Sequence, residues 1–344
     1  MENRKKIGLI LLMMVELLYS PFLEAATVSK MRLSMGTLLQ IEVESSDPAQ
    51  AEAAMESGFL EVAQLDKMLS NYSQDSEISR INRDGFLKEV LLSEEMSHFI
   101  QQSIQLSQST GGAFDITIEP LTQIWKLRER SLEKFPALRE IQSGRSKVGA
   151  QNLNFSFQDK ILRFKVQGMG LDTGGIGKGY ALDRALEKME KFPILSATLN
   201  FGGEILYGST SAQKREIKIR NPLSPEKDWG RITFSVEPKG AAVSTSGNYE
   251  RFVTAEGQTK KIGHILNPKT GAPVQNELRS VTVIAPTATV ADALSTAIFV
   301  MGLEESKKFL QKQEGISALL LYLSKEGDLE SYLYSSPQHK VTQE

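Results

Sequence analysis

The sequence predicts an α+β fold, a single unit in which mixed or antiparallel sheets pack against helices. Three observations favour this class. Hydrophobic residues make up 40% and charged residues 24% of the 344-residue chain, as in ordinary soluble globular proteins. Segments with the alternation typical of strands are interspersed with segments of helical spacing. No repeat or low-complexity linker divides the chain.

In the N-terminal half, a strand is predicted over residues 38–44. Asp47-Pro48 is typical of a helix cap followed by a first-turn proline. The helix continues through apolar residues at helical spacing, namely Met55, Phe59, Val62, Leu65 and Leu69. A second helix is predicted over residues 93–107, with His98 on its solvated side.

In the C-terminal half, Leu162, Phe164 and Val166 alternate as in a strand that leads into a glycine-rich turn and a helix. A further helix is predicted over residues 290–301. A closing hairpin should pair residues 317–323 with 329–334, and residues 335–344 should form a flexible tail. The remaining predicted strands cover residues 197–206, 216–220, 231–236 and 281–285.

Composition excludes several classes of function. The formal net charge of −2 makes nucleic acid and anionic membranes improbable partners. Because cysteine is absent, disulfide scaffolds, thiolate nucleophiles, iron–sulfur clusters and cysteine-rich zinc sites are excluded. The three histidines, His98, His264 and His339, are too far apart for a local ligand pair. A bound metal should therefore have oxygen ligands, as magnesium or calcium does.

Residues 1–26 have the layout of an export signal. A basic cluster at Arg4, Lys5 and Lys6 precedes an apolar run and the small residues Ala25 and Ala26. The run is too short for a typical membrane-spanning helix, although an uncleaved N-terminal anchor is an alternative. No cysteine follows it, which excludes bacterial lipoprotein attachment. We therefore expect an exported protein whose folded body covers residues 27–334.

The first candidate site covers residues 172–180. A strand, a glycine-rich turn and a helix start would gather backbone N–H groups and Lys178 around one phosphate-sized spot. The segment is not a Walker loop, because Asp172 replaces its first glycine and Gly179 replaces its Ser or Thr. It also lacks the dinucleotide fingerprint, since Tyr180 stands where a glycine is required. A tight turn that needs positive φ explains the glycines equally well.

The second candidate is Asp292 with Thr296, four residues apart on one face of a predicted helix. A carboxylate and a hydroxyl at this spacing can hold magnesium together with water, a backbone carbonyl and substrate phosphates. The alternative is structural: Asp292 favours the helix macrodipole and Thr296 bonds to a backbone carbonyl.

The third candidate is His264, which precedes the turn of residues 267–271. Its imidazole could orient or deprotonate a hydroxyl, or contact phosphate when charged. A histidine satisfied by nearby backbone is the alternative.

Weaker signals are spread along the chain. Tyr72 and residues 111–115 could wall an aromatic or adenine pocket, and Met35 could simply begin a strand. Residues 200–204 and 244–251 offer backbone donors and small residues where a ligand could approach closely. No G-x-S-x-G elbow supports a serine hydrolase.

Taken together, eight ordered stretches resemble the FAD:protein FMN transferases, or ApbE-type flavin transferases. The resemblance runs from about Met35 to beyond Gly302. The stretches are MGTLLQIEV, LSNYSQDSEISRIN, TGGAFDITIEPLTQIW, LDTGGIGKGYALD, NFGGEI, VSTSGNYERF, GHILNPKTGAPV and VTVIAPTATVADALSTAIFVMG.

The resemblance implies an α+β enzyme with FAD bound in a cleft between subregions. Such enzymes hold Mg²⁺ at the pyrophosphate of FAD. They transfer the FMN half to a threonine or serine hydroxyl of an exported or membrane protein, and they release AMP. The chain would then work in the periplasm or at the outer face of the inner membrane, while its acceptor and its oligomeric state stay open.

By position, the resemblance places the metal at Gly175, Asp292 and Thr296, and catalysis at Lys178, His264 and Asp292. Flavin-nucleotide contacts fall on Met35, Tyr72, Ala113, Phe114, Asp115, Asp172, Lys178 and His264. Two features depart from the family: Gly177 replaces a frequent alanine, and the lipoprotein cysteine is missing. The second departure concerns membrane anchoring and not the chemistry.

Two alternatives share these residues. With water as the nucleophile, the same site would be a metal-dependent FAD pyrophosphatase that yields FMN and AMP. A non-catalytic, exported flavin-binding protein is the other alternative, although a magnesium pair has no obvious use in mere binding.

Overall fold

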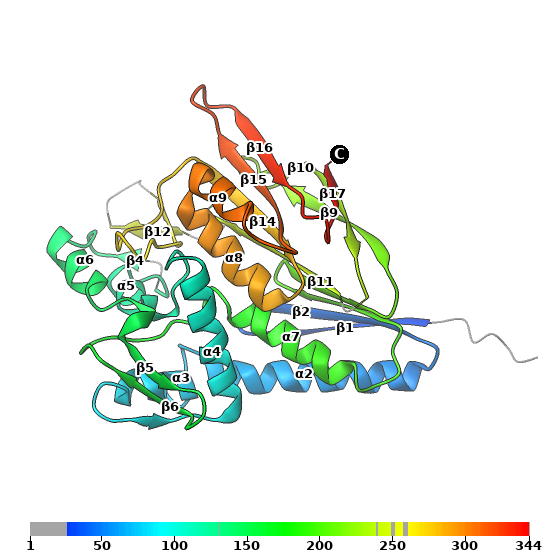
Figure 1. Cartoon of the computed structure of the whole chain (residues 1–344), viewed down its shortest axis with the longest axis horizontal. Helices are drawn as coiled ribbons and strands as arrows, with labels where there is room; N and C mark the ends of the chain where they lie inside the picture. The colour runs from blue at the N-terminus through cyan, green and yellow to red at the C-terminus, as the bar shows by residue number, and fades with distance from the viewer. Residues whose placement is uncertain (1–25, 130, 239, 249–251, 257–260, 344) are drawn as a thin grey trace, which may run out of the picture.

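The computed structural model describes residues 26–129, 131–238, 240–248, 252–256 and 261–343. At its centre lies an eight-stranded sheet, in the order β1-β2-β7-β8-β11-β14-β15-β16, with every neighbouring pair antiparallel (Figure 1). In that order the strands span Ala26–Ser34, Thr37–Ser45, Ser196–Phe201, Glu204–Ser209, Ala241–Gly247, Leu278–Ala285, Ser317–Leu323 and Leu329–Tyr334.

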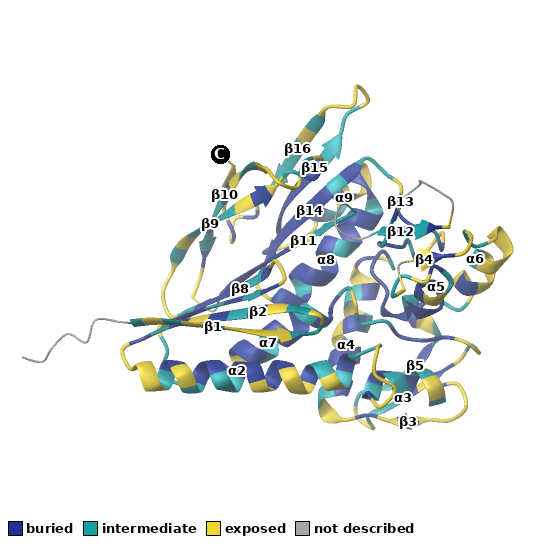
Figure 2. Cartoon of the chain, turned by 180° about the vertical axis from the view of Figure 1, so that it is seen from behind, coloured by how far each residue is buried: buried dark blue, intermediate teal, exposed yellow. Residues whose placement is uncertain are grey.

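Helices cover one face of this sheet (Figure 1). Helix α2 (Pro48–Leu69) packs on β1 and β2, α7 (Gly177–Met189) on β7 and β8, and α8 (Ala288–Met301) on β11 and β14. Helix α9 (Leu303–Leu310) packs on β15, and α4 (Glu94–Ser109) contacts α8. The main apolar core lies between these helices and the sheet. Most of α8 is therefore buried, as Figure 2 shows.

Local capping explains where the two N-terminal helices begin. Asp47 accepts a hydrogen bond from the N–H of Ala49 at 2.9 Å, and Pro48 opens α2 as predicted. Ser93 caps α4 in the same way, through a 3.1 Å bond from the N–H of Met96. His98 is half-exposed, as expected, and its imidazole lies 3.4 Å from the carboxylate of Glu94.

A three-stranded antiparallel sheet packs on the opposite face of the central sheet. Its order is β17-β10-β9, with bounds Val341–Gln343, Asp228–Val236 and Gln213–Arg220. Ile232 and Phe234 of β10 pack there against Val243 and Ile284 of the central sheet in a second core. The middle strands of the central sheet are thus covered on both faces, since successive residues of a strand point to opposite sides, whereas β1 keeps many exposed residues.

The predicted flexible tail is wrong for residues 335–343. The Val341 side chain is buried in the second core, and β17 pairs with β10. The hydroxyl of Ser317 donates to the carbonyl of His339 at 2.7 Å and accepts the N–H of Ser336 at 2.8 Å. Burial of the apolar Val341 side chain against β10 stabilises this segment, although its composition is mostly polar.

A further subregion flanks the helical layer. Helices α5 (Glu119–Ile124) and α6 (Leu138–Arg145) pack with strands β4 (Ser131–Leu132), β12 (Phe252–Ala255) and β13 (Lys261–Gly263) around a third core. Because β12 is parallel to β4 and antiparallel to β13, this small sheet is mixed. Nearby elements are α3 (Glu77–Asp84), β3 (Val90–Leu91), β5 (Leu153–Ser156), β6 (Ile161–Phe164), and the 3₁₀ turns Ile116–Ile118 and Ala150–Asn152.

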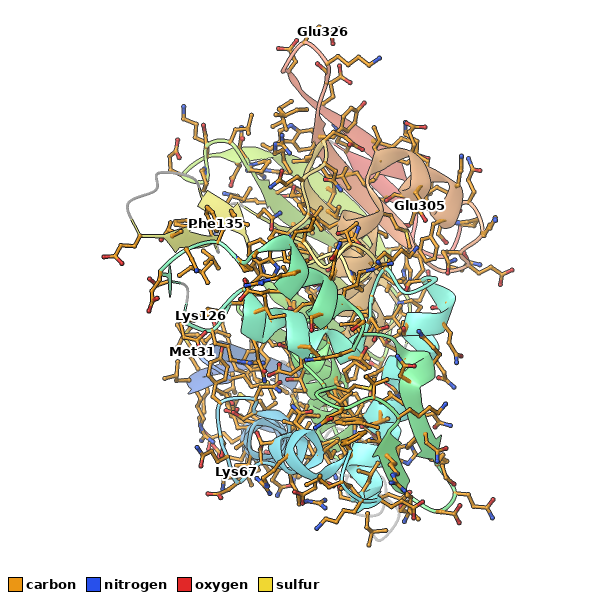
Figure 3. The ribbon with its side chains drawn as sticks, turned by 90° about the vertical axis from the view of Figure 1, so that its left-hand side faces the viewer. Met31, Lys67, Lys126, Phe135, Glu305 and Glu326 are labelled. Atoms are coloured by element: carbon orange, nitrogen blue, oxygen red, sulfur yellow. The ribbon has the colours of Figure 1, made fainter. Side chains whose placement is uncertain are left out.

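The predicted fold class is confirmed, with local corrections. The closing hairpin forms as β15 and β16, and Figure 3 shows Glu326 at its projecting tip. The single strand predicted over residues 197–206 is two strands, because Gly202 and Gly203, at φ +63° and +96°, make a two-residue hairpin turn. Strands β1 and β11 have no counterpart in the prediction. None of the described helices is both long and apolar enough to cross a membrane, and the leader over residues 1–25 lies outside the described residues.

Candidate active site

A cavity of about 350 Å³ lies where the start of α7, the β7–β8 turn, β9, β11 and α8 meet. Four residues singled out from the sequence line it together: Lys178, His264, Asp292 and Thr296. They come from distant parts of the chain. The other lining residues are Thr37, Gly174, 202–205, 217–220, 243–247, Ile265 and Thr282.

Asp292 lies deep in the wall of this cavity and is only 4% exposed. Its carboxylate accepts one backbone hydrogen bond, from the N–H of Gly179 at 3.1 Å. Burial raises its pKa above the ordinary aspartate value, whereas the charge of Lys178 and the Gly179 N–H act in the opposite direction. Asp292 is therefore a buried carboxylate with few neutralising partners, so a cation beside it would be stabilised.

Thr296 follows one turn later on α8. Its hydroxyl lies 3.3 Å from that of Ser246 in β11, and the Ser246 hydroxyl is 2.8 Å from that of Ser295. A Cβ built on Gly175 would lie 3.7 Å from the Thr296 Oγ1, so the glycine turn lies directly against Thr296. The three predicted metal residues thus occupy one neighbourhood. Ser246 belongs to residues 244–251, which gave only a weak sequence signal for ligand binding.

Gly179 allows α7 and α8 to approach closely. A Cβ at this position would lie 2.3 Å from the carbonyl oxygen of Ala288 and 2.8 Å from the Cβ of Asp292. Any side chain here would push the two helices apart. A glycine therefore occupies the position where a Walker loop has Ser or Thr, for a packing reason.

Side-chain amides hold the loop before α7. Asn82 accepts the Leu171 N–H at 2.7 Å and donates to the Leu171 carbonyl at 2.9 Å. Asn71 also donates to that carbonyl, at 2.8 Å, and accepts the Thr173 N–H at 3.1 Å. None of Gly174, Gly175, Gly177 and Gly179 has a positive φ. The explanation of these glycines by left-handed backbone is therefore wrong, and close packing replaces it at Gly179.

Lys178, the second residue of α7, forms an ion pair with Glu204 at the start of β8. Both line the cavity. The helix N-terminus disfavours a cation, so this lysine depends on nearby anions. Sequence reasoning placed Glu204 only within a weak motif, and the signal that could have found it is the Gly-Gly hairpin turn that immediately precedes it.

His264 follows β13 and lines the cavity beside Ile265. A Cβ at Gly263 would overlap the Asn248 side chain at 2.1 Å, so Asn248 packs directly against the backbone before the histidine. After it, Asn267 accepts the Lys269 N–H at 2.8 Å in the predicted turn. Trp125 donates to the Gly271 carbonyl at 2.9 Å and ties this turn to the third core.

The other residues predicted to contact the flavin nucleotide do not line this cavity. Met35 occupies the β1–β2 turn at φ +43°, and its N–H donates to Asp66 at 2.8 Å. Ala113 and Phe114 are buried, and the Phe114 ring would lie 3.5 Å from a Cβ on Gly175. Asp115 accepts hydrogen bonds from Thr117 and Ala150, so this carboxylate is fully used within the fold.

Tyr72 and Asp172 are linked through Arg128, which the sequence did not indicate. The Tyr72 residue is 80% exposed, and the Arg128 guanidinium lies 5.8 Å from its ring centroid. Arg128 also pairs with Asp172 at 2.8 Å and with buried Glu119. Burial raises the pKa of Glu119 although Arg128 opposes the shift. These residues lie beside the loop that leads to the cavity, so a long ligand could contact both groups.

Asp292, Thr296 and Ser246 provide side-chain oxygen atoms in the cavity wall. The described residues contain no cluster of three or more His, Cys, Asp or Glu side chains that could hold a metal. A cation here would depend on one carboxylate, hydroxyl and backbone oxygens, water and substrate, which suits magnesium better than zinc.

Comparisons with known proteins found relatives both in sequence and in structure. The sequence model of the ApbE family matches residues 35–320. An FAD:protein FMN transferase of Escherichia coli strain K12 is 30% identical over 89% of this chain and 86% of that protein. Another from Treponema pallidum is 30% identical over 86% and 85%. The structure of the flavin transferase ApbE from Vibrio cholerae matches with a TM-score of 0.76 over 92% and 98% of the two chains, at 24% identity. The ApbE protein of Thermotoga maritima matches at 0.74 over 89% and 96%, at 28% identity.

Proposed function

This chain belongs to the ApbE family, and from that premise we propose that its cavity transfers the FMN half of FAD to a serine or threonine hydroxyl, releasing AMP. The chain is a flavin transferase, with FAD as its substrate and a protein as its acceptor. The observation that supports placing the reaction in this cavity is the convergence of Lys178, His264, Asp292 and Thr296 on its wall.

We assign a Mg²⁺ site to Asp292, Thr296 and the backbone at Gly175. The residues present fit this ion: Asp292 is buried with a single backbone donor, and its neighbours are hydroxyl and backbone oxygens. A hard cation suits such donors and leaves coordination positions for water and phosphate oxygens. When bound, it would supply positive charge next to the pyrophosphate.

The chain's own residues stabilise the charge that develops during transfer. The acceptor hydroxyl oxygen bonds to the phosphorus of the FMN half, while the bond from that phosphorus to the bridging oxygen breaks and this oxygen leaves with AMP. Lys178 faces the added charge, and a donor aimed at a transition state contributes about 3–4 kcal/mol.

His264 orients the acceptor hydroxyl and takes its proton. The turn of residues 267–271 and the Asn248 contact hold the histidine segment in place, so the imidazole can be aimed before substrate binds. The remaining part of FAD lies across the loop toward Phe114, Tyr72 and Asp172. Met35 completes that side of the binding site, and the buried residues Ala113 and Asp115 hold the segment that carries Phe114.

We also propose that the chain acts outside the cytoplasm, in the periplasm or at the outer face of the inner membrane. The support is the export layout of residues 1–26, and the acceptor would then be an exported or membrane flavoprotein. Fusing these residues to a reporter that is active only after export tests the proposal. A reporter retained in the cytoplasm would contradict it.

The function is tested by its product. The purified protein is incubated with FAD, Mg²⁺ and candidate exported flavoproteins. We expect covalent flavin fluorescence on the acceptor in a denaturing gel, and an acceptor mass increased by one FMN. Free FMN and AMP without labelled protein would instead indicate a pyrophosphatase, and FAD binding without AMP would indicate a carrier.

A further inference from the structure

The ion pair between Lys178 and Glu204 is largely buried. The Lys178 side chain is 22% exposed and that of Glu204 only 9%. Charged residues are seldom so buried unless they are paired. The pair lies in the wall of the cavity that we assign to flavin transfer.

The β7–β8 hairpin fixes the position of Glu204. Gly202 and Gly203 form the turn, and Asn200 accepts the N–H of Gly203 at 3.1 Å. A Cβ at Gly202 would lie 2.8 Å from the Thr37 hydroxyl, so the turn also packs tightly on β2. As the first residue of β8, Glu204 is held by rigid backbone and not by a flexible loop.

The carboxylate of Glu204 is only half used. One oxygen pairs with Lys178, while the other, Oε2, is buried and receives no hydrogen bond from the described residues. A buried acceptor without a donor is unfavourable, and its retention in a fold calls for an explanation. Stability alone does not provide one, because a hydrophobic pair would fill the same space without this penalty.

We propose that Glu204 is a positioning residue for flavin transfer, whose carboxylate holds the Lys178 ammonium at the point where the pyrophosphate of FAD binds. Without Glu204, Lys178 would be drawn toward the carboxylate of Asp292, whose charge already interacts with it. Lys178 would then compete with the cation that we assign to Asp292. This inference rests on the proposed function, and it adds a residue that acts through Lys178.

The experiment is a double-mutant cycle of Glu204→Gln and Lys178→Met, measured by flavinylation kinetics with FAD, Mg²⁺ and an acceptor. We expect E204Q to lower kcat about 10- to 100-fold, as for residues that orient a group at the reacting atoms, and to change KM for FAD by less than about threefold. In the K178M background, E204Q should have no further effect on kcat. Glu204→Asp should fall between E204Q and the unchanged protein.

Glu61→Gln is the matched control. Glu61 is also a buried glutamate paired with a lysine of α7, Lys188, at 3.5 Å, but neither residue lines the cavity. We expect E61Q to keep its kcat. Thermal melting checks folding, and the double variant should melt higher than K178M alone, because K178M leaves a buried carboxylate unpaired.

The outcomes distinguish failure of the proposed function from failure of this inference alone. If the protein without substitutions transfers no FMN, the proposed function and this inference are both overturned. If it transfers FMN, then an E204Q kcat within about twofold of normal overturns the inference alone. The inference is also overturned if E204Q lowers kcat by the same factor in the normal and in the K178M background, because Glu204 would then act independently of Lys178. If E204Q fails to fold, E204D and the double variant provide the same comparison.

Discussion

Asp183 and Asp292 are two carboxylates at one crossing, that of α7 on α8, and their surroundings differ. Asp183 of α7 accepts three hydrogen bonds from the first turn of α8: from the N–H groups of Ala288 at 2.7 Å and Thr289 at 2.8 Å, and from the Thr289 hydroxyl. Among the described residues, Asp292 of α8 accepts one hydrogen bond, from the N–H of Gly179 in α7.

The difference distinguishes a carboxylate that is satisfied within the fold from the one to which we assign the metal. Burial raises the pKa of both, but the donors of Asp183 come from an otherwise unsatisfied helix N-terminus, so its charge is compensated within the fold. Asp292 depends on Lys178, which also pairs with Glu204. The carboxylate that we assign to the metal site is therefore the one with fewer donors from the fold.

The largest effect is expected for Asp292→Ala. Removing the carboxylate should reduce Mg²⁺-dependent transfer about 1,000-fold, the upper range for loss of one electrostatic group at a transition state. The protein should still fold, because the lost group is a buried charge with few partners. Flavinylation rates with and without chelator measure the effect, and unchanged activity would refute the metal assignment.

His264→Ala tests whether the part of the cavity wall that follows β13 takes part in the chemistry. We expect transfer to fall about 100-fold, as is typical for loss of a general base, while FAD is still bound. Rates and FAD binding are measured on the same preparation. A variant that flavinylates at the normal rate would remove His264 from the mechanism.

Asp183→Ala should have the opposite profile. Loss of the acceptor for the α8 N-terminus should lower the free energy of unfolding by about 1–2 kcal/mol, the usual range for a lost helix cap. Transfer at a temperature where the variant is folded should stay within about twofold of normal. Urea denaturation and flavinylation rates check the two parts. An activity loss as large as that of D292A would end the distinction between the carboxylates.

The pH dependence of stability gives a smaller effect of known sign. The pKa of Asp183 is raised above its ordinary value of 3.8 by burial, despite the bonds from Thr289 and Ala288. The folded state therefore holds this proton more tightly, so the contribution to stability is present below pH 3.8 and is lost as pH rises through the raised pKa. Denaturation from acidic to neutral pH should show a decline that is weaker in Asp183→Asn. Parallel curves would contradict the raised pKa.

The smallest effect concerns the start of α7, which contributes to both carboxylate environments. A Cβ at Gly177 would lie 3.5 Å from the Thr173 side chain, an ordinary contact, and its φ is not positive. Gly177→Ala should therefore raise the free energy of unfolding by about 0.4–1 kcal/mol, because it reduces the entropy of the unfolded chain. Gly179→Ala is the matched control and should be destabilising, since its Cβ would meet the Ala288 backbone. If both variants behave alike, close packing does not explain Gly179.

Local signals made part of the molecule predictable. The Asp47 and Ser93 caps and the helical spacing that follows them located α2 and α4, because capping and periodicity act within a few residues. The turn of residues 267–271 formed as predicted, since Asn267 bonds to backbone two and three residues further on. The motifs around Lys178, His264, Asp292 and Thr296 correctly indicated residues that share one cavity.

Other features depended on partners far away in the sequence. Val341 lies in a strand because β10 provides an apolar surface for it, and nothing in the tail itself indicates this. Arg128 joins Asp172, Glu119 and Tyr72 without any local motif. Gly179 looked like a turn glycine, but the reason for it is the Ala288 backbone on another helix.

By itself, the sequence determined the α+β class and the main helices, because these depend on composition and on spacing within single segments. Only the tertiary structure decided which carboxylate is saturated and which is left with capacity for a cation, and that Glu204 faces Lys178. Those properties depend on how many donors reach a group from other elements and on how much water is excluded around it, and both are fixed only when distant segments pack together.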